Sequence, residues 1–175
     1  MRMEPQEVAS FRGFDDELER VSDGDRVEVA HRRRLCAAAV ETLYAAVDDS
    51  GMPIYAQWLV RRDQQAAIHR VAKGFFRQLG EGEALVEGAY TFVNFRRLGA
   101  MVDGMSQLLV RARDAGDERV FTYVAEDNIP SLRGCAKAGF VPDQLRRTHC
   151  RFGVRRVYHI PLAALSEKRW AEAVE

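Results

Sequence analysis

Residues 83–116 read EALVEGAYTFVNFRRLGAMVDGMSQLLVRARDAG, and this stretch decides the fold. Its first part is rich in β-branched and aromatic residues, which predicts a strand over residues 83–95. The segment FRRLGAM then breaks the pattern. Apolar residues at helical spacing predict a helix over residues 103–115, closed by Gly116 in a C-cap position. A strand, a loop and a helix are therefore expected in that order.

The residues after this stretch predict a second strand, a short helix and a hairpin. RVFTYVA, residues 119–125, is a short apolar strand, and residues 128–139 form a helix with a proline near its first turn. FVPDQLRR and VRRVYHIPL predict a final hairpin, and residues 166–174 a helical tail. Because the helices over 103–115 and 129–138 are typical crossover connections, the strands that they join should be parallel.

The residues before the stretch predict helices and a hairpin. Charged segments with apolar residues at helical spacing predict one or two amphipathic helices over residues 11–34. TLYAAV and PIYAQWLV, on either side of DDSGM, predict a β-hairpin that turns near Ser50 and Gly51. An apolar stripe predicts a helix over residues 62–79, whereas the amino-terminal residues carry no clear first strand. The whole pattern indicates an α/β domain with a mixed sheet.

The composition is that of a globular protein. The chain has 175 residues, 47% of them hydrophobic and 30% charged, which predicts one domain over residues 1–175. Its 26 basic and 26 acidic residues balance, so the net charge does not favour nucleic acid or an anionic membrane as a partner. No apolar stretch is long enough to span a bilayer, and the first residues do not resemble a secretion signal. Three cysteines without CxxC spacing favour the reducing cytoplasm.

The loop between the predicted strand and helix, residues 96–101, is a candidate anion site. Free backbone N–H groups and the positive end of a helix dipole can bind a phosphate there. Taken alone, such a turn is more often a plain connection. The features that follow favour the phosphate site: Asn128 ends the next strand, Ser131 follows it, and a Gly-Phe pair closes the short helix at residues 139–140.

This combination resembles the GNAT superfamily of acyl-CoA-dependent N-acetyltransferases. The family shows Gln or Arg, two variable residues, Gly, one variable residue and Gly or Ala at the start of its main helix. One strand later it shows an Asn, a short helix and a closing Gly-Phe. Here the first motif is Arg96, Gly99 and Met101, and the second is DNIPSLRGCAKAGF, residues 127–140. The second motif matches well, whereas Met101 departs from the small residue of the family.

The resemblance implies a mixed, mostly antiparallel GNAT-like sheet with flanking helices and a splayed pair of parallel strands, here residues 83–95 and 119–125. Acetyl-CoA would lie between these strands as a cosubstrate. Its pyrophosphate would lie on the backbone of the loop, its pantetheine arm would pair with the end of the first strand, and the asparagine would face it from the second. The implied contacts are those of Phe92, Val93, Arg96, Arg97, Leu98, Gly99, Ala100, Met101, Asn128 and Ser131. Asp103 is interpreted as the N-cap of a helix that begins one turn later than in the family, which leaves a longer phosphate loop.

Acetyl transfer to an amine requires a general base. Deprotonating a primary ammonium at pH 7 costs about 4.6 kcal/mol, and in the family a strand glutamate in this region often takes the proton. Glu87, deeper in the strand, is the first candidate, and Glu83 is the second. The alternative is that both carboxylates lie on the solvated start of the strand.

The remaining steps of the reaction have weaker candidates. A backbone N–H group near Phe92 or Val93 could stabilise the oxyanion. The family tyrosine that protonates the departing thiolate is replaced here by Cys135, which we interpret as a small core residue, and Tyr158 is an alternative proton donor. The four histidines are too dispersed to predict a metal site.

The sequence therefore predicts an N-acetyltransferase that moves an acetyl group from acetyl-CoA to a primary amine by direct attack in a ternary complex. The acceptor, a small molecule or a peptide, is not identified, and a homodimer is left open. One alternative is an inactive acyl-CoA-binding module, suggested by Met101 and Cys135. The other is an arginine-rich nucleic-acid-binding domain, suggested by the last hairpin. The arginines of that hairpin are Arg146, Arg147, Arg151, Arg155 and Arg156.

Overall fold

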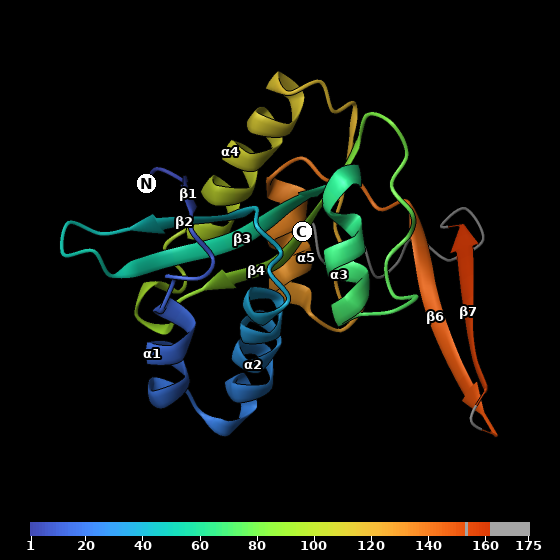
Figure 1. Cartoon of the computed structure of the whole chain (residues 1–175), viewed down its shortest axis with the longest axis horizontal. Helices are drawn as coiled ribbons and strands as arrows, with labels where there is room; N and C mark the ends of the chain where they lie inside the picture. The colour runs from blue at the N-terminus through green and yellow to red at the C-terminus, as the bar shows by residue number, and fades with distance from the viewer. Residues whose placement is uncertain (153, 162–175) are drawn as a thin grey trace. The chain divides into compact units, whose positions relative to one another are not determined.

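The structure is a computed structural model that describes residues 1–152 and 154–161. The chain forms two compact units, Met1–Tyr123 and Val124–Glu175. The first unit holds a five-stranded sheet and four α-helices, and the described residues of the second hold one helix and a two-stranded sheet (Figure 1). The prediction of a single domain over residues 1–175 stays a prediction.

The sheet of the first unit is mixed, as the sequence predicts. Its strands lie in chain order: β1 (Glu4–Gln6), β2 (Leu43–Val47), β3 (Pro53–Arg61), β4 (Glu83–Thr91) and β5 (Arg119–Phe121). The first four pair antiparallel, and β4 pairs parallel with β5. The parallel pairing runs only from Glu83, opposite Arg119, to Leu85, opposite Phe121. Beyond Leu85, β4 continues to Thr91 without β5 beside it, which gives the splayed pair of parallel strands.

A β-bulge interrupts β4 in this open part. Glu87 lies opposite Trp58 and Tyr90 lies opposite Ala56, so two residues of β4 face a single residue of β3. Gly88, the first of the two, has a φ of 66°. A Cβ atom there would lie 2.7 Å from the Trp58 ring, so the position requires glycine on both counts. The bulge therefore shifts the alternation of side chains between the two faces of β4 after Glu87.

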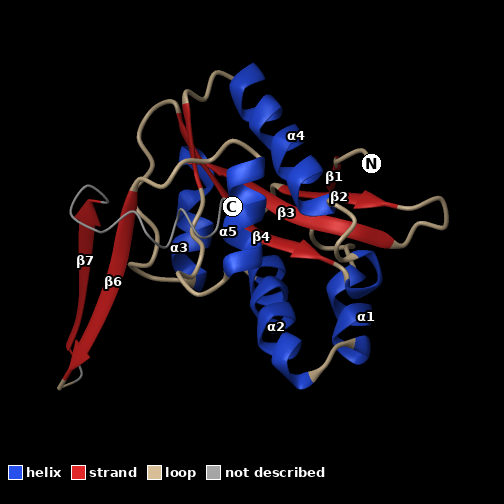
Figure 2. Ribbon diagram, turned by 180° about the vertical axis from the view of Figure 1, so that it is seen from behind, coloured by secondary structure: helices blue, strands red, loops and turns tan. Residues whose placement is uncertain are grey.

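Helices cover both faces of this sheet. Figure 2 shows α1 (Gly13–Arg20) and α2 (Asp23–Ala37) on one face and α4 (Ala100–Asp114) on the other. The larger core lies under α1, α2 and α3 (Gln65–Val71), where Phe14 stacks on Trp58 with ring centroids 5.7 Å apart. On the opposite face α4 packs closely on β3, because a Cβ atom at Gly104 would lie 2.5 Å from the Tyr55 ring.

Three predicted elements have different bounds. The predicted helix over residues 62–79 is wrong in its second half. A 3₁₀ helix, η1 (Arg62–Gln64), leads into α3, which ends at Val71, and Gly74 then takes a φ of 66° that no helix accommodates. The strand predicted to reach residue 95 ends at Thr91 and is followed by the 3₁₀ helix η2 (Val93–Phe95). The second parallel strand is limited to β5.

The amino-terminal strand is a further correction, because no clear strand pattern marks these residues. β1 pairs with β2, and the chain in front of it is tied to α4. The Met3 N–H donates to Gln107 Oε1 at 2.9 Å, and Arg111 Nη2 donates to the Met3 carbonyl at 2.6 Å. These contacts hold a segment whose proline and charged residues have little strand propensity of their own.

The second unit contains the short helix and the hairpin that the sequence predicts. α5 (Ile129–Lys137) begins after Asn128, with a proline in its first turn. β6 (Gln144–Arg151) and β7 (Val154–Pro161) pair antiparallel and form a sheet of their own. The helical tail predicted over residues 166–174 lies outside the described residues. No helix among the described residues is long and apolar enough to cross a bilayer.

Candidate active site

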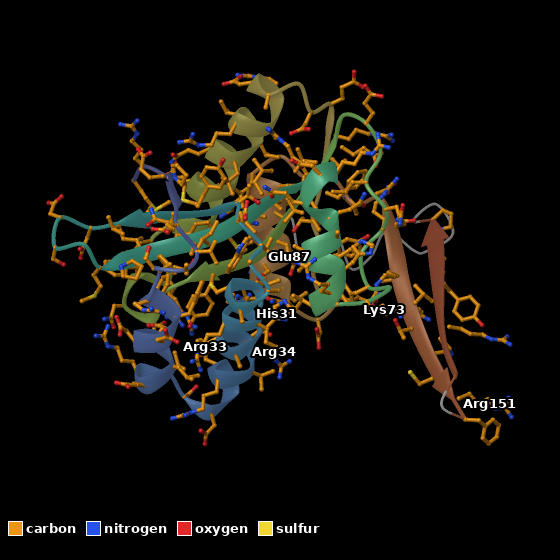
Figure 3. The ribbon with its side chains drawn as sticks, viewed as in Figure 1. His31, Arg33, Arg34, Lys73, Glu87 and Arg151 are labelled. Carbon is orange, nitrogen blue, oxygen red and sulfur yellow. The ribbon has the colours of Figure 1, made fainter. Side chains whose placement is uncertain are left out.

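The first candidate base is Glu87. It lies one residue before the bulge, in the part of β4 that β5 leaves unpaired. Its side chain is 14% exposed, and Oε1 lies 3.7 Å from Nε2 of His31 in α2, whose side chain is 34% exposed. Figure 3 shows the two residues where α2 meets the sheet. Glu87 is therefore a partly buried carboxylate with a more exposed imidazole beside it.

The second candidate base, Glu83, is buried and makes structural contacts. Glu83 is 4% exposed, so the alternative in which it lies on a solvated strand end is wrong. Its carboxylate accepts a hydrogen bond from the Gly80 N–H at 2.9 Å and forms ion pairs with Arg119 at 2.6 Å and Arg77 at 3.5 Å. These contacts hold β5 against the start of β4, and they leave Glu87 as the carboxylate of the open part of the strand.

The loop in front of α4 has the geometry of an anion site. Arg97 and Gly99 have φ angles of 68° and 80°, and Gly99 is the N-cap of α4. No described residue accepts a hydrogen bond from the backbone N–H groups of Ala100, Met101 and Val102, which open the helix. An oxyanion could accept from these N–H groups at the positive end of the helix dipole.

The longer phosphate loop that we inferred from Asp103 is wrong. α4 begins at Ala100, and Asp103 lies within its first turn, where it accepts a hydrogen bond from Gln107 Nε2 at 3.3 Å. Gly99 takes the N-cap position instead, because its left-handed φ lets the chain turn sharply into the helix. The loop therefore has the length expected from the family motif, with Leu98 exposed at its tip.

Arg96, the first residue of that motif, is engaged by α2. Its guanidinium donates two hydrogen bonds of 3.0 Å to Asp25 and one of 3.4 Å to the Tyr90 hydroxyl. The hydrogen bonds from Arg96 lower the pKa of Asp25, and those to Asp25 raise the pKa of Arg96. Arg96 thus anchors the loop to α2 as well as lying beside the anion site.

The two N–H groups predicted for the pantetheine arm and the oxyanion have partners in this structure. The Phe92 N–H donates to the Ile54 carbonyl at 3.1 Å, and the Val93 N–H donates to Glu17 Oε1 at 2.8 Å. The Tyr90 hydroxyl also donates to Glu17 Oε1, at 2.9 Å. Burial and the hydrogen bond to Glu17 raise the pKa of the Tyr90 hydroxyl. The roles of Phe92 and Val93 stay predictions, and they require these bonds to rearrange.

Comparison with known proteins identifies the architecture. No family model matches the chain, and no curated protein sequence matches it either. Solved structures do match it. An aminoglycoside 6'-N-acetyltransferase from Acinetobacter haemolyticus has a TM-score of 0.55 and 18% identity, over 86% of this chain and 98% of its own. The chain has the GNAT fold.

Two more structures support this assignment. An aminoglycoside N-acetyltransferase in complex with CoA matches with a TM-score of 0.55 and 14% identity, over 86% of this chain and 99% of its own. A glucosamine-6-phosphate N-acetyltransferase from Arabidopsis thaliana matches with a TM-score of 0.50 and 13% identity, over 86% and 97%. The GNAT fold also accounts for the order of the elements, in which α4 connects the splayed strands β4 and β5.

The site residues predicted in the second unit lie at α5. Asn128 is the N-cap of α5, and its Oδ1 accepts a hydrogen bond from the Ser131 N–H at 3.2 Å. Cys135 is buried within α5, and burial raises the pKa of its thiol to about 11. Tyr158, the alternative proton donor, is exposed on β7. Contact of Asn128 and Ser131 with a cosubstrate stays a prediction.

Three residues of the candidate site were not predicted from the sequence. His31, Glu17 and Asp25 all come from α1 and α2, and each contacts β4 or the loop that follows it. The sequence predicts these helices only as charged and amphipathic. No motif marks the three residues, because their partners lie more than 50 positions away in the chain.

Proposed function

We propose that this chain is an acetyl-CoA-dependent N-acetyltransferase that acts on a primary amine. The observation that supports this most directly is the position of Glu87. It is a half-buried carboxylate in the part of β4 that β5 leaves open, within a GNAT fold. A general base for an amine needs this combination of partial burial and access.

The residues of the loop fit the phosphates of acetyl-CoA. The N–H groups of Ala100, Met101 and Val102 would bind the pyrophosphate, and the exposed Arg97 would add a positive charge at its edge. Bound there, acetyl-CoA would supply an acetyl group activated as a thioester. Asn128 and Ser131 stay contacts predicted from the family motif.

Glu87 and the amine complete the proposed reaction. The carboxylate would take a proton from the ammonium of the acceptor, which frees the nitrogen lone pair to attack the thioester carbonyl. The new C–N bond would replace the C–S bond, and the CoA thiolate would leave and take a proton from water. His31, 3.7 Å from Glu87 and more exposed, would then pass that proton towards solvent. The acceptor would be a small molecule or a peptide with a primary amine.

Two measurements test the proposal. Calorimetric titration with acetyl-CoA measures binding, and thiol release across a panel of primary amines measures transfer. Glu87→Gln should lower turnover by about 10²- to 10⁴-fold and leave the affinity for CoA within about 2-fold. Glu41→Gln, at an exposed position outside the site, is the matched control and should keep wild-type turnover.

Each failure has a distinct meaning. If acetyl-CoA gives no binding heat at any concentration tested, the proposed cosubstrate is wrong. If acetyl-CoA binds but no amine of the panel releases thiol, the inactive acyl-CoA-binding module replaces the enzyme. If Glu87→Gln keeps wild-type turnover, Glu87 is not the base.

A further inference from the structure

The hairpin of β6 and β7 carries a strong positive charge. Residues 144–161 contain five arginines and two histidines, and no aspartate or glutamate. Outside the hairpin the chain has 21 basic and 26 acidic residues, so the balanced total includes a segment with a net charge of +5. Figure 1 shows β6 and β7 as a two-stranded ribbon, and they form a sheet of their own. A surface of this charge attracts anions.

The exposed arginines of the hairpin do not stabilise the fold. Arg147, Arg151 and Arg156 are exposed, and none of them forms an ion pair or a hydrogen bond with a described residue. In the first unit, by contrast, Arg61 and Arg119 pair with carboxylates at 2.8 and 2.6 Å. Like charges on neighbouring strands repel each other, and the hairpin has no carboxylate of its own to offset this cost. The three guanidinium groups are therefore available to an external anion.

The strand register places these charges on one face of the hairpin. Arg147 lies opposite Tyr158, and His149 lies opposite Arg156. Residues opposite each other in an antiparallel pair share a face, and so do residues two apart on one strand. The same face therefore carries Arg151, two residues beyond His149. Alternate residues of a strand are about 6.8 Å apart, so the arginines can follow successive phosphates of an extended chain.

Two exposed aromatic side chains lie beside these charges. Tyr158 is 45% exposed, and the His149 ring packs edge-on against it with centroids 5.4 Å apart. Phe152, in the turn, is 90% exposed, and the Arg151 guanidinium lies 5.2 Å from the centroid of its ring. Figure 3 shows Arg151 at this end of the hairpin. Aromatic rings beside arginines are typical of surfaces on which the bases of single-stranded nucleic acids stack.

Stability does not explain an aromatic residue at position 152. Phe152 has a φ of 50°, in the left-handed region that favours glycine or asparagine and disfavours bulky residues. Its exposed ring buries little apolar surface in return. An unfavourable backbone angle under an exposed aromatic ring is typical of a position that contacts a ligand.

The same observations disfavour three other occupants of this face. A second copy of the hairpin would bring two segments of charge +5 together, which is unfavourable. A bilayer would need more apolar surface, and Phe152 is the one exposed large aliphatic or phenyl side chain among the described residues of the hairpin. The bases of a duplex are stacked on each other and cannot stack on Phe152 or Tyr158.

We propose that the face of the β6–β7 hairpin that carries Arg147, Arg151 and Arg156 binds single-stranded nucleic acid. The three arginines contact successive phosphates, and Phe152 and Tyr158 stack on bases. RNA and DNA share this chemistry of phosphates and exposed bases. The proposal does not depend on the proposed acetyl transfer, and its test needs no acetyl-CoA.

The probe is a fluorescein-labelled oligothymidylate of about 12 nucleotides, and fluorescence anisotropy measures its binding to the full chain. We expect a Kd of about 10 µM or tighter at 50 mM NaCl. Neutralisation of three to four phosphates predicts that 200 mM NaCl weakens binding by about 20- to 50-fold. A duplex of the same length should bind at least about 5-fold more weakly. An oligouridylate shows whether RNA or DNA binds more tightly, and either preference supports the proposal.

The arginine variants test the phosphate contacts. Arg147→Gln, Arg151→Gln and Arg156→Gln should each weaken binding by about 3- to 10-fold at 50 mM NaCl and reduce its salt dependence. The combined variant should bind at least about 30-fold more weakly than wild type. Arg113→Gln, which removes the same charge from an exposed position of α4, is the matched control and should bind like wild type.

Phe152→Asn tests the stacking contact. Asparagine accommodates a positive φ, so this variant should keep or raise the stability of the fold. The loss of the ring should weaken binding by about 5-fold or more and leave the salt dependence unchanged, because no charge is removed. Thermal unfolding checks that the variant is folded.

Four results would overturn the proposal. The first is a folded wild-type protein that leaves the anisotropy of the probe unchanged at 10-fold the expected Kd. The second is unchanged affinity in the combined arginine variant. The third is an equal affinity for the duplex together with unchanged affinity in Phe152→Asn, which would indicate a plain attraction for polyanions.

The fourth result is another occupant of the same face. Binding to vesicles of phosphatidylcholine and phosphatidylglycerol without binding to the oligonucleotide would assign the face to a membrane. Self-association in light scattering that the combined arginine variant abolishes, again without oligonucleotide binding, would assign it to a second copy of the chain.

Discussion

Asp25 in α2 accepts two hydrogen bonds of 3.0 Å from Arg96, and this ion pair joins α2 to the loop in front of α4. The two side chains are 30% and 37% exposed, so solvent screens the interaction. The pair nevertheless fixes the backbone from which the N–H groups of the anion site project. The loop of the GNAT fold is thereby shaped by a helix that lies 71 residues earlier in the chain.

The first prediction concerns stability and pH. Arg96 lowers the pKa of Asp25 in the folded protein, so the pair stabilises the fold at every pH above about 3.9, the usual value of an aspartate. This contribution is lost as the pH falls through the folded pKa of Asp25. Asp25→Asn should therefore lower the free energy of unfolding by about 0.5–1 kcal/mol at pH 7, after allowance for solvent screening, and by almost nothing near pH 2. Urea unfolding at the two pH values measures this. An equal loss at both would show that the charge of Asp25 is irrelevant.

The second prediction concerns the anion site. Gly99→Val should weaken CoA binding by at least about 10-fold, because its φ of 80° strains a branched residue and the side chain blocks close approach to the helix N-terminus. Gly116→Val is the matched control, since Gly116 follows the other end of α4 with a φ of 90° and equally open space for a Cβ atom. Both variants should lose similar stability, and only the first should lose affinity in calorimetry. Equal affinities would exclude this loop as the phosphate site.

The third prediction separates the two carboxylates of β4. Glu83→Gln removes a buried charge from two arginines and should destabilise the first unit by about 3 kcal/mol, which thermal unfolding measures. Turnover per folded molecule, at a temperature well below the transition, should stay within about 3-fold of wild type. A Glu83→Gln protein that keeps its stability but loses turnover would transfer the role of base from Glu87 to Glu83.

The fourth prediction concerns Cys135. Because burial raises the pKa of its thiol to about 11, the thiol stays protonated at neutral pH and should resist alkylation. Mass spectrometry after iodoacetamide treatment should find the exposed Cys150 modified well before Cys135. Cys135→Ala should retain most of the thiol release at saturating substrates, as expected of a core residue. A loss beyond about 100-fold with CoA affinity preserved would make Cys135 the general acid.

Local patterns in the sequence predicted most elements of this fold. The hairpin of β2 and β3 has aromatic and β-branched strands around an acidic, glycine-containing turn, and the structure forms it there. α5 has a proline in its first turn, and it forms where the sequence predicts a short helix. Strand alternation, helical spacing and caps act over a few residues, so these patterns can be recognised in a single sequence.

Where the local patterns predicted the wrong element or the wrong bounds, a tertiary contact or a single backbone angle determined the observed structure. β1 is a strand because β2 and α4 supply its partners, although its own residues do not favour one. The helix predicted over residues 62–79 stops at Val71 even though its apolar stripe continues, and Phe76 and Leu79 are buried without it. Hydrophobic spacing fixes which side chains are buried, and it does not fix the backbone that carries them.

The sequence by itself predicted most of the element order, the parallel crossover between β4 and β5, a candidate anion loop at residues 96–101 and the two candidate carboxylates of β4. Only the tertiary structure gave those carboxylates different surroundings: Glu83 pairs with two arginines, and Glu87 lies beside His31 in the part of the strand that β5 leaves unpaired. It alone also placed Glu17 and Asp25 against β4 and its loop. The physical reason is range: propensity and periodicity act between neighbours in the chain, whereas burial, ion pairing and pKa depend on neighbours in space.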